Sequence, residues 1–177
     1  MLDPFCGRGT TLYAARHMGM SAWGVDTSAI AVAIARSKLA SATLEETSEF
    51  IDKLLAVEPG RIPETPFFRS AFSKATLRGV CSLREGLMRI KKQTDVSVLV
   101  RAAALGCLHG PLSQTIEGAA YFSNQMPRTF STKPDYSVQY WKKKGLKAPK
   151  VLVKDVLLRK LSRILALKEA PCGTLDQ

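Results

Sequence analysis

Apolar residues at spacings of three and four dominate the chain beyond residue 43, and this is the spacing of an amphipathic helix. The pattern predicts five helices, over residues 43–57, 73–90, 94–108, 135–144 and 150–168. Thr43 and Glu46 form a capping-box pair at the start of the first, and Gly145 follows the fourth. No clear strand is found after Val25. A chain of 177 residues that is 46% hydrophobic can bury the core that such helices need.

Only the beginning of the chain alternates between strand and helix patterns. Residues 1–2 read as the end of a strand that begins outside the sequence, and residues 21–25 read as a second short strand. Helices are predicted over 10–18, with Thr10 or Thr11 as the N-cap, and from Ser28 to about residue 39. The sequence therefore predicts a βαβα unit followed by an almost purely helical region.

The segment between the first strand and the first helix has the sequence DPFCGRGTT, at residues 3–11. Its glycines let the backbone pass close to a ligand, and the free N–H groups of the following helix suit a carboxylate or a phosphate. Asp26 lies 19 residues beyond Gly7, where a carboxylate commonly accepts hydrogen bonds from ribose hydroxyls. Leu12 replaces the third glycine of a dinucleotide site, and no P-loop lysine is present. A nucleoside with a carboxylate and no pyrophosphate fits best, and S-adenosylmethionine is such a ligand.

This segment resembles the cofactor motif of amino-group DNA methyltransferases, which methylate N6 of adenine or N4 of cytosine. Residues 24–26 (GVD) resemble their second cofactor motif. Residues 121–130 (YFSNQMPRTF) resemble a subset in which a helical insertion separates the cofactor motifs from the catalytic motif. The resemblance implies an α/β fold, a partial S-adenosylmethionine-dependent methyltransferase (Rossmann-like) βαβα unit followed by a mostly α-helical region. It covers most of the chain, but only residues 1–26 carry a specific motif.

The resemblance also implies S-adenosylmethionine as the cofactor and assigns residues to it. The backbone of residues 5–9 would surround the methionine part, Asp3 would lie near the ammonium group, and Asp26 would bind the ribose. The two threonines that follow the turn would face the carboxylate, and Thr27 or Ser28 would lie beside the adenine. The predicted cofactor-binding residues are Asp3, Phe5, Cys6, Gly7, Gly9, Thr10, Thr11 and Asp26.

The motif that holds the target base in these enzymes, Ser/Asn/Asp-Pro-Pro-Tyr/Phe/Trp, is missing, since the sequence contains no Pro-Pro pair. The polar residue of that motif holds the target amino group, and its ring stacks on the flipped base. We therefore assign no catalytic residue. We expect the chain to be an incomplete methyltransferase that does not methylate alone, with the remaining methyltransferase half as one expected partner.

Positive charge is concentrated toward the end of the chain. The net charge is +11, and residues 128–168 alone hold 12 Lys/Arg against 2 Asp/Glu. Residues 121–144 interleave aromatic rings with cations. Because cations neutralise phosphates and rings stack on bases, this pattern predicts contact with DNA; the alternative is that the rings pack in the core and the lysines form a solvated face. The predicted nucleic-acid-binding residues are Arg128, Lys133, Lys142, Lys143 and Lys144.

Two other functions fit the same residues. An RNA methyltransferase is the first, because turns of the same type occur there, although no RNA-binding module is recognisable. A non-catalytic, basic, helical nucleic-acid-binding protein that retains the turn is the second. The missing catalytic motif favours this second function if the chain is a complete gene product.

The remaining features predict no further chemistry. The four cysteines form no CxxC pair, so neither a zinc site nor a disulfide framework is expected. No apolar run is long enough to span a membrane and no signal peptide is recognisable, so we expect a cytoplasmic protein without membrane contact.

The sequence is expected to divide into three parts. Residues 1–58 form a partial cofactor-binding unit, residues 59–170 form a basic helical region that is an insertion or serves DNA recognition, and residues 171–177 form a tail.

Overall fold

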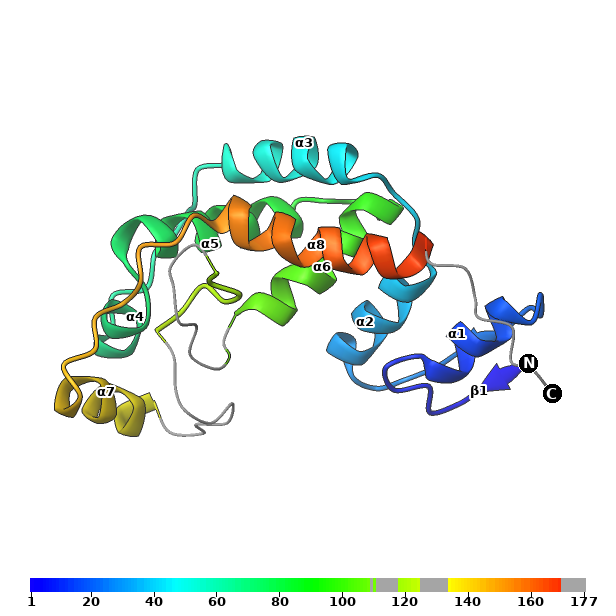
Figure 1. Cartoon of the computed structure of the whole chain (residues 1–177), viewed down its shortest axis with the longest axis horizontal. Coiled ribbons are helices and arrows are strands. Elements are labelled where there is room, and N and C mark those ends of the chain that lie inside the picture. Colours follow the sequence, from blue (N-terminus) through cyan, green and yellow to red (C-terminus); the bar gives the residue numbers. More distant parts are fainter. Residues whose placement is uncertain (109, 111–117, 125–133, 170–177) are drawn as a thin grey trace.

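The computed structural model describes residues 1–108, 110, 118–124 and 134–169. In chain order its elements are β1 (Leu2–Asp3), α1 (Thr10–His17), β2 (Trp23–Gly24), α2 (Ala29–Leu39), α3 (Leu44–Leu55), α4 (Pro66–Ala71), α5 (Lys74–Met88), α6 (Asp95–Cys107), α7 (Pro134–Lys143) and α8 (Val153–Glu169). Figure 1 shows them as an elongated helical body with the N-terminal elements at one end.

The predicted α/β fold with a Rossmann-like βαβα unit is wrong. Helices account for 60% of the described residues and strands for 3%. The described residues contain a single sheet of two parallel strands with two residues each, in which Leu2 pairs with Trp23. These strands contribute little to the core, because Leu2 is 67% exposed and Trp23 is 68% exposed. The apolar surface that stabilises the fold is buried between helices, so the protein is mostly helical.

The core lies between the helices from α3 to α8. One cluster of buried apolar side chains joins them, and its largest fully enclosed members are Trp141, Phe122, Ile51, Leu99, Leu157 and Leu161. α8 packs against both α3 and α6 along the body (Figure 1). A separate small cluster, formed by Cys6, Leu12 and Ala35, holds α1 and the turn against α2.

Local capping confirms several predicted helix starts. The Thr43 hydroxyl accepts the Glu46 N–H at 3.1 Å, and the Glu46 carboxylate accepts the Thr43 N–H at 2.7 Å, which completes the capping box of α3. Ser28 accepts the N–H of Ala31 at 3.3 Å and caps α2. Thr94 forms a capping box with Ser97 at the start of α6.

Two local predictions are wrong. Neither Thr10 nor Thr11 caps α1, since its N-cap is Gly9 in a left-handed conformation and no side chain caps it. No helix is predicted between residues 57 and 73, where Pro59, Pro63 and Pro66 are typical of a loop, but Pro66 is the first residue of α4. Proline suits that position, because the first helical N–H has no intrahelical acceptor.

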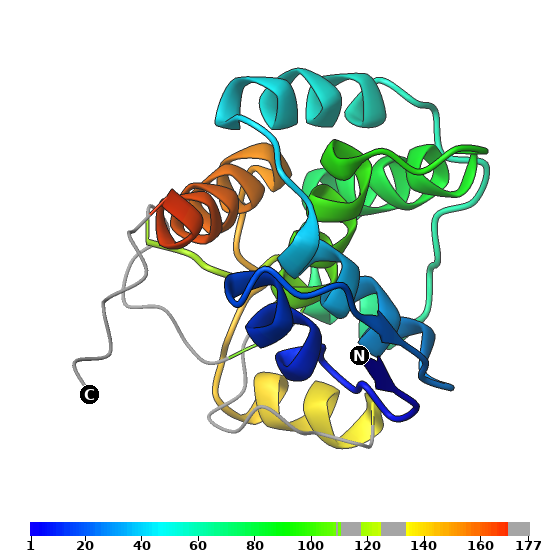
Figure 2. The same cartoon turned by 90° about the vertical axis from the view of Figure 1, so that its right-hand side faces the viewer.

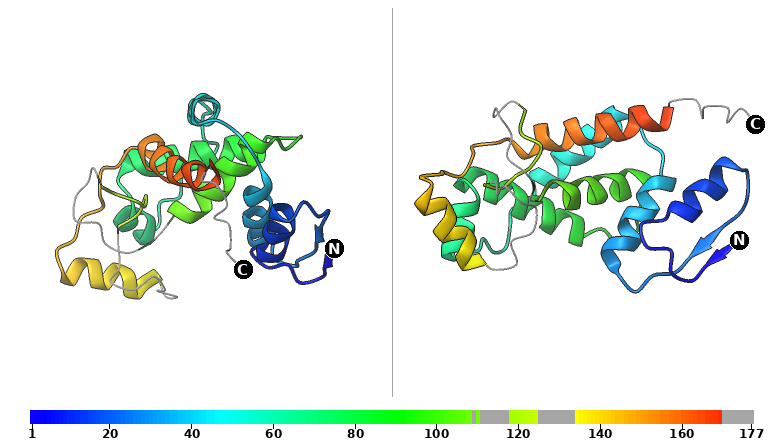
Figure 3. Two further views of the ribbon diagram at one scale, coloured as in Figure 1. Left: turned by 45° about the vertical axis from the view of Figure 1, so that its right-hand side comes forward. Right: turned by 60° about the horizontal axis from the view of Figure 1, so that its bottom comes forward.

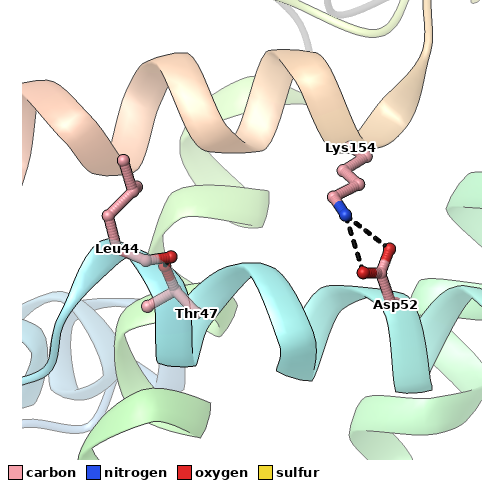
Figure 4. A network of polar contacts seen from close by, with 4 residues as sticks. All are labelled: Leu44, Thr47, Asp52 and Lys154. Atoms are coloured by element: carbon pink, nitrogen blue, oxygen red, sulfur yellow. Dashed lines mark hydrogen bonds and ion pairs between the residues drawn. The ribbon is translucent and has the colours of Figure 1, made fainter.

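A polar contact adds to the packing of α8 on α3 (Figure 4). The Lys154 ammonium donates to both carboxylate oxygens of Asp52, at 2.7 and 2.6 Å. Thr47, one and a half turns earlier on α3, is buried and donates its hydroxyl to the Leu44 carbonyl at 2.7 Å. The ion pair is partly exposed, so it contributes at most about 1 kcal/mol and the apolar core decides the packing.

The N-terminal elements and α7 lie at opposite ends of the molecule. β1 and α1 form one end, and α7 lies at the other, in both Figure 1 and the right-hand view of Figure 3. α2 joins the N-terminal end to the helical body by packing against α6, and Figure 2 faces this end. The predicted cofactor turn and the predicted nucleic-acid-binding helix are therefore held apart by the body.

Candidate functional site

The turn between β1 and α1 is held by two aspartates. The Phe5 N–H donates to Asp3 Oδ1 at 3.1 Å. The Gly7 N–H donates to Asp26 Oδ2 at 2.9 Å, across 19 residues of sequence. The Cys6 N–H donates to the Val25 carbonyl at 2.9 Å, so the turn also continues the pairing of the two strands. The structure thus brings the predicted turn residues and the predicted ribose acceptor together.

Two glycines give this turn its shape. Gly7 has a φ of +48° and Gly9 a φ of +73°, in the left-handed region that favours glycine. A Cβ on Gly9 would lie 2.7 Å from the Cβ of Ala35, so only glycine lets α1 begin this close to α2. A Cβ on Gly7 would meet nothing within 4 Å, which leaves the backbone of the turn open on that side.

Asp26 keeps hydrogen-bonding capacity after these contacts. Its Oδ2 accepts the Gly7 N–H, and its Oδ1 accepts the Ser28 N–H at 2.8 Å. A carboxylate offers about four lone-pair positions, so each oxygen has room for another donor. Asp26 is half-buried, and a ligand with a pair of hydroxyl groups could reach it.

The other predicted cofactor-binding residues differ in their exposure. Cys6 is buried against Leu12, so it offers a ligand its backbone and not its thiol. Phe5 is 85% exposed, and its ring lies free on the outside of the turn. Thr10 is exposed and Thr11 is half-buried at the start of α1, where the N–H groups have no side-chain cap.

A hollow of about 410 Å³ lies beside Asp26, between α2 and the start of α6. Its polar lining comes from Asp26, Thr27, Arg36, Gln93 and Arg101. Arg36 donates to Gln93 Oε1 at 2.8 Å and so joins α2 to the segment before α6. The volume is within the range of small-molecule sites, about 300–1,000 Å³. Sequence reasoning missed the last three residues, because no local motif marks residues that meet only through helix packing.

The predicted nucleic-acid-binding region is divided by the structure. Lys142, Lys143 and Lys144 are exposed together at the end of α7, whereas Arg128 and Lys133 lie outside the described residues. Of the rings interleaved with these cations, Trp141 is 1% exposed and packs 5.8 Å from the ring centroid of Phe67. Phe122 is also fully buried, and Tyr136 is exposed. Core packing, the alternative kept open for these rings, therefore holds for Trp141 and Phe122.

The thiols and acids of the described residues suggest no metal chemistry. No group of three His, Cys, Asp or Glu residues in this part of the chain could hold a metal ion. Cys81 and Cys107 are buried free thiols, and burial raises the pKa of Cys107 to about 11. Burial also raises the pKa of the Cys81 thiol, so both thiols are neutral at ordinary pH and unsuited to act as nucleophiles.

Comparison with known proteins identifies no relative of this chain. A search of protein-family models, curated proteins and solved structures finds no match to this chain. Within the described ranges, none of the helices has the length and apolar character needed to cross a membrane. Function must therefore be inferred from the residues and their geometry.

Proposed function

We propose that the turn at residues 4–9 and Asp26 bind S-adenosylmethionine, and that the chain takes part in methylating an exocyclic amino group of a DNA base. One observation carries this proposal. The Gly7 N–H lies 2.9 Å from the Asp26 carboxylate, so the turn and the acid, distant in sequence, form one site. The resemblance of residues 3–11 and 24–26 to the amino-group DNA methyltransferases supports the identity of the ligand.

Each part of the cofactor finds a matching group. The uncapped N–H groups of α1 suit the methionine carboxylate. One carboxylate oxygen of Asp3 accepts the Phe5 N–H, and the other is available to the ammonium group. Asp26 accepts the ribose hydroxyls, and Thr27 is among the residues that line the adjacent hollow. The cofactor supplies the activated methyl group, and the protein supplies binding and orientation.

The exposed apolar side chains of the two strands support a partner at this end. Leu2, Trp23 and Val25 are exposed next to one another on paired segments, and Phe5, in the turn that follows β1, is exposed as well. A two-stranded sheet is marginal alone, and an exposed apolar cluster commonly marks an interaction surface. We infer that a second polypeptide carrying the base-holding motif covers this surface and completes the cofactor site.

Because the Pro-Pro-aromatic motif is missing, the purified chain is expected to transfer no methyl group to DNA. Incubation with tritiated S-adenosylmethionine and mixed-sequence duplex DNA should give the radioactivity of a protein-free sample. Incorporation that grows with protein concentration would contradict the inferred partner and require a base-holding site within this chain.

The ribose contact is tested by combining a variant with a modified ligand. Asp26→Asn removes the charge and is expected to weaken adenosine binding by about 10- to 100-fold, the worth of a hydrogen bond to a charged group. Calorimetry should show that 2′,3′-dideoxyadenosine binds the wild type as weakly as adenosine binds the variant. The variant itself should not distinguish the two ligands.

Asp155→Asn is the matched control, since it removes one exposed carboxylate from α8, away from the turn. It should bind adenosine like the wild type. If the wild type binds both nucleosides equally, Asp26 is not the ribose acceptor. Circular dichroism of each variant checks that the helices are intact.

The helical fold favours a second candidate, nucleic-acid binding without catalysis. The exposed lysines at the end of α7 lie far from the turn and need no cofactor for their contacts. S-adenosylmethionine titration separates the two candidates, because a purely nucleic-acid-binding protein gives no heat with the cofactor.

A further inference from the structure

A small, partly open hollow between α6 and α8 is lined by three cations, of which Lys160 and Arg163 are exposed and Arg159 is half-buried. Arg159, Lys160 and Arg163 come from α8, and the other lining residues include Gly106 of α6 and Tyr121. Its volume is about 80 Å³. A water molecule occupies about 30 Å³ in the liquid, and small-molecule sites begin near 300 Å³, so this hollow has room for one small polyatomic group and not for a nucleoside.

The positive charge at this hollow is uncompensated among the described residues. The Arg159 guanidinium donates to the Ala119 carbonyl at 2.7 Å, but its Nε is buried with no hydrogen-bond partner there. Lys160 and Arg163 form no hydrogen bond or ion pair with any described residue. The four ion pairs among the described residues involve other side chains. A buried donor without a partner costs about 1–3 kcal/mol. An acceptor in the hollow would remove that cost.

The neighbouring thiol does not supply the missing negative charge. Cys107 is fully buried on α6 beside this cluster, and desolvation raises its pKa to about 11 despite the nearby Lys160 and Arg159. It is therefore neutral near pH 7. The three cations are left facing a space that holds no described carboxylate.

We propose that this hollow is a phosphate-binding site, in which the Arg159 Nε–H, Lys160 and Arg163 donate to the oxygens of one phosphate group. Arginine matches phosphate geometry through paired N–H donors, and lysine adds a point charge. Either free inorganic phosphate or the backbone of a nucleic acid could supply the group. The proposal does not depend on the cofactor turn, which lies on different elements.

The first arm of the test uses inorganic phosphate with the full chain. Calorimetry is expected to show phosphate binding that is at least about tenfold weaker in Lys160→Gln/Arg163→Gln. Tenfold corresponds to the loss of one charge-assisted hydrogen bond. Lys91→Gln/Lys92→Gln removes the same charge from two exposed lysines that precede α6 and should bind like the wild type. Arg159→Lys keeps the charge, removes the Nε donor and should also weaken binding, with its thermal midpoint measured to show that it folds.

The second arm replaces phosphate by duplex DNA and identifies the source of the group. If a backbone phosphate occupies the hollow, the Lys160→Gln/Arg163→Gln variant loses DNA affinity and inorganic phosphate competes with DNA in the wild type. If free phosphate is the ligand, only the first arm responds. Equal behaviour of the wild type and the double variant in both arms, or equal weakening by the Lys91/Lys92 control, would overturn the site.

Discussion

Trp141→Ala is expected to lower the free energy of unfolding by about 3–5 kcal/mol, the usual cost of deleting a large ring from a core. Trp141 is 1% exposed, contacts Phe67 of α4 and joins α7 to the main cluster. Tyr136 lies on the same helix but is 59% exposed, so Tyr136→Ala should change stability by no more than about 0.5 kcal/mol.

Urea denaturation followed by circular dichroism measures both variants without depending on tryptophan fluorescence. The pair separates the two interpretations of the aromatic residues in this region. A base-stacking Trp141 would be removable with little loss of stability and a large loss of DNA affinity. Equal stability of Trp141→Ala and Tyr136→Ala would contradict the packing of α7 against α4.

Reversing the charge of Lys142, Lys143 and Lys144 to glutamate is expected to abolish most DNA binding. The three lysines are exposed at the end of α7, and Lys142 and Lys143 lie in its last turn. Each phosphate contact on duplex DNA contributes about 0.9 to the slope of log affinity against log salt, so losing three contacts should flatten that slope by about 2.7. The loss should be alike for all DNA sequences, since phosphate contacts carry no base information.

Fluorescence anisotropy with a labelled duplex at several salt concentrations gives both affinity and slope. A matched triple variant, Lys53→Glu/Lys91→Glu/Lys92→Glu, makes the same charge change at exposed positions outside α7. It should lose far less affinity and keep the slope. Identical behaviour of the two triple variants would show that only net charge matters and that α7 is an ordinary solvated surface.

Helix starts were predictable because capping is local. The Thr43–Glu46 box and the Ser28 cap depend on residues within one turn, and the structure contains both. α4 was missed because prolines usually mark loops, although Pro66 is compatible with a first helical turn. Local chemistry thus accounts for the starts of α2 and α3.

The fold class was not predictable from the same local signals. Residues 1–2 and 21–25 are apolar enough for strands, but a sheet requires further strands to cover them, and that is a property of the whole chain. The burial of Trp141 was equally hidden, since rings between lysines suit both a core and a base-stacking surface. Arg159 and Gly106 line the same hollow only because α8 packs on α6, and no local motif predicts that packing.

The glycine turn and Asp26 lie together as the sequence predicted, while their binding of a cofactor stays a prediction. The glycines of the turn and Asp26 have fixed chemical requirements, a left-handed backbone and a carboxylate within reach, and both are visible in the residues alone. The adjacent hollow with Arg36 and Gln93 was not predicted, because α2 and the segment before α6 are distant in sequence.

Titration of ¹⁵N-labelled protein with S-adenosylmethionine, followed by amide chemical shifts, tests the proposed cofactor site most directly. The largest shift changes are expected at Gly7 and Gly9 and at Ser28, whose N–H donates to Asp26. They should saturate together, as one binding event requires. Unchanged shifts at these three amides throughout the titration would contradict S-adenosylmethionine binding at the turn.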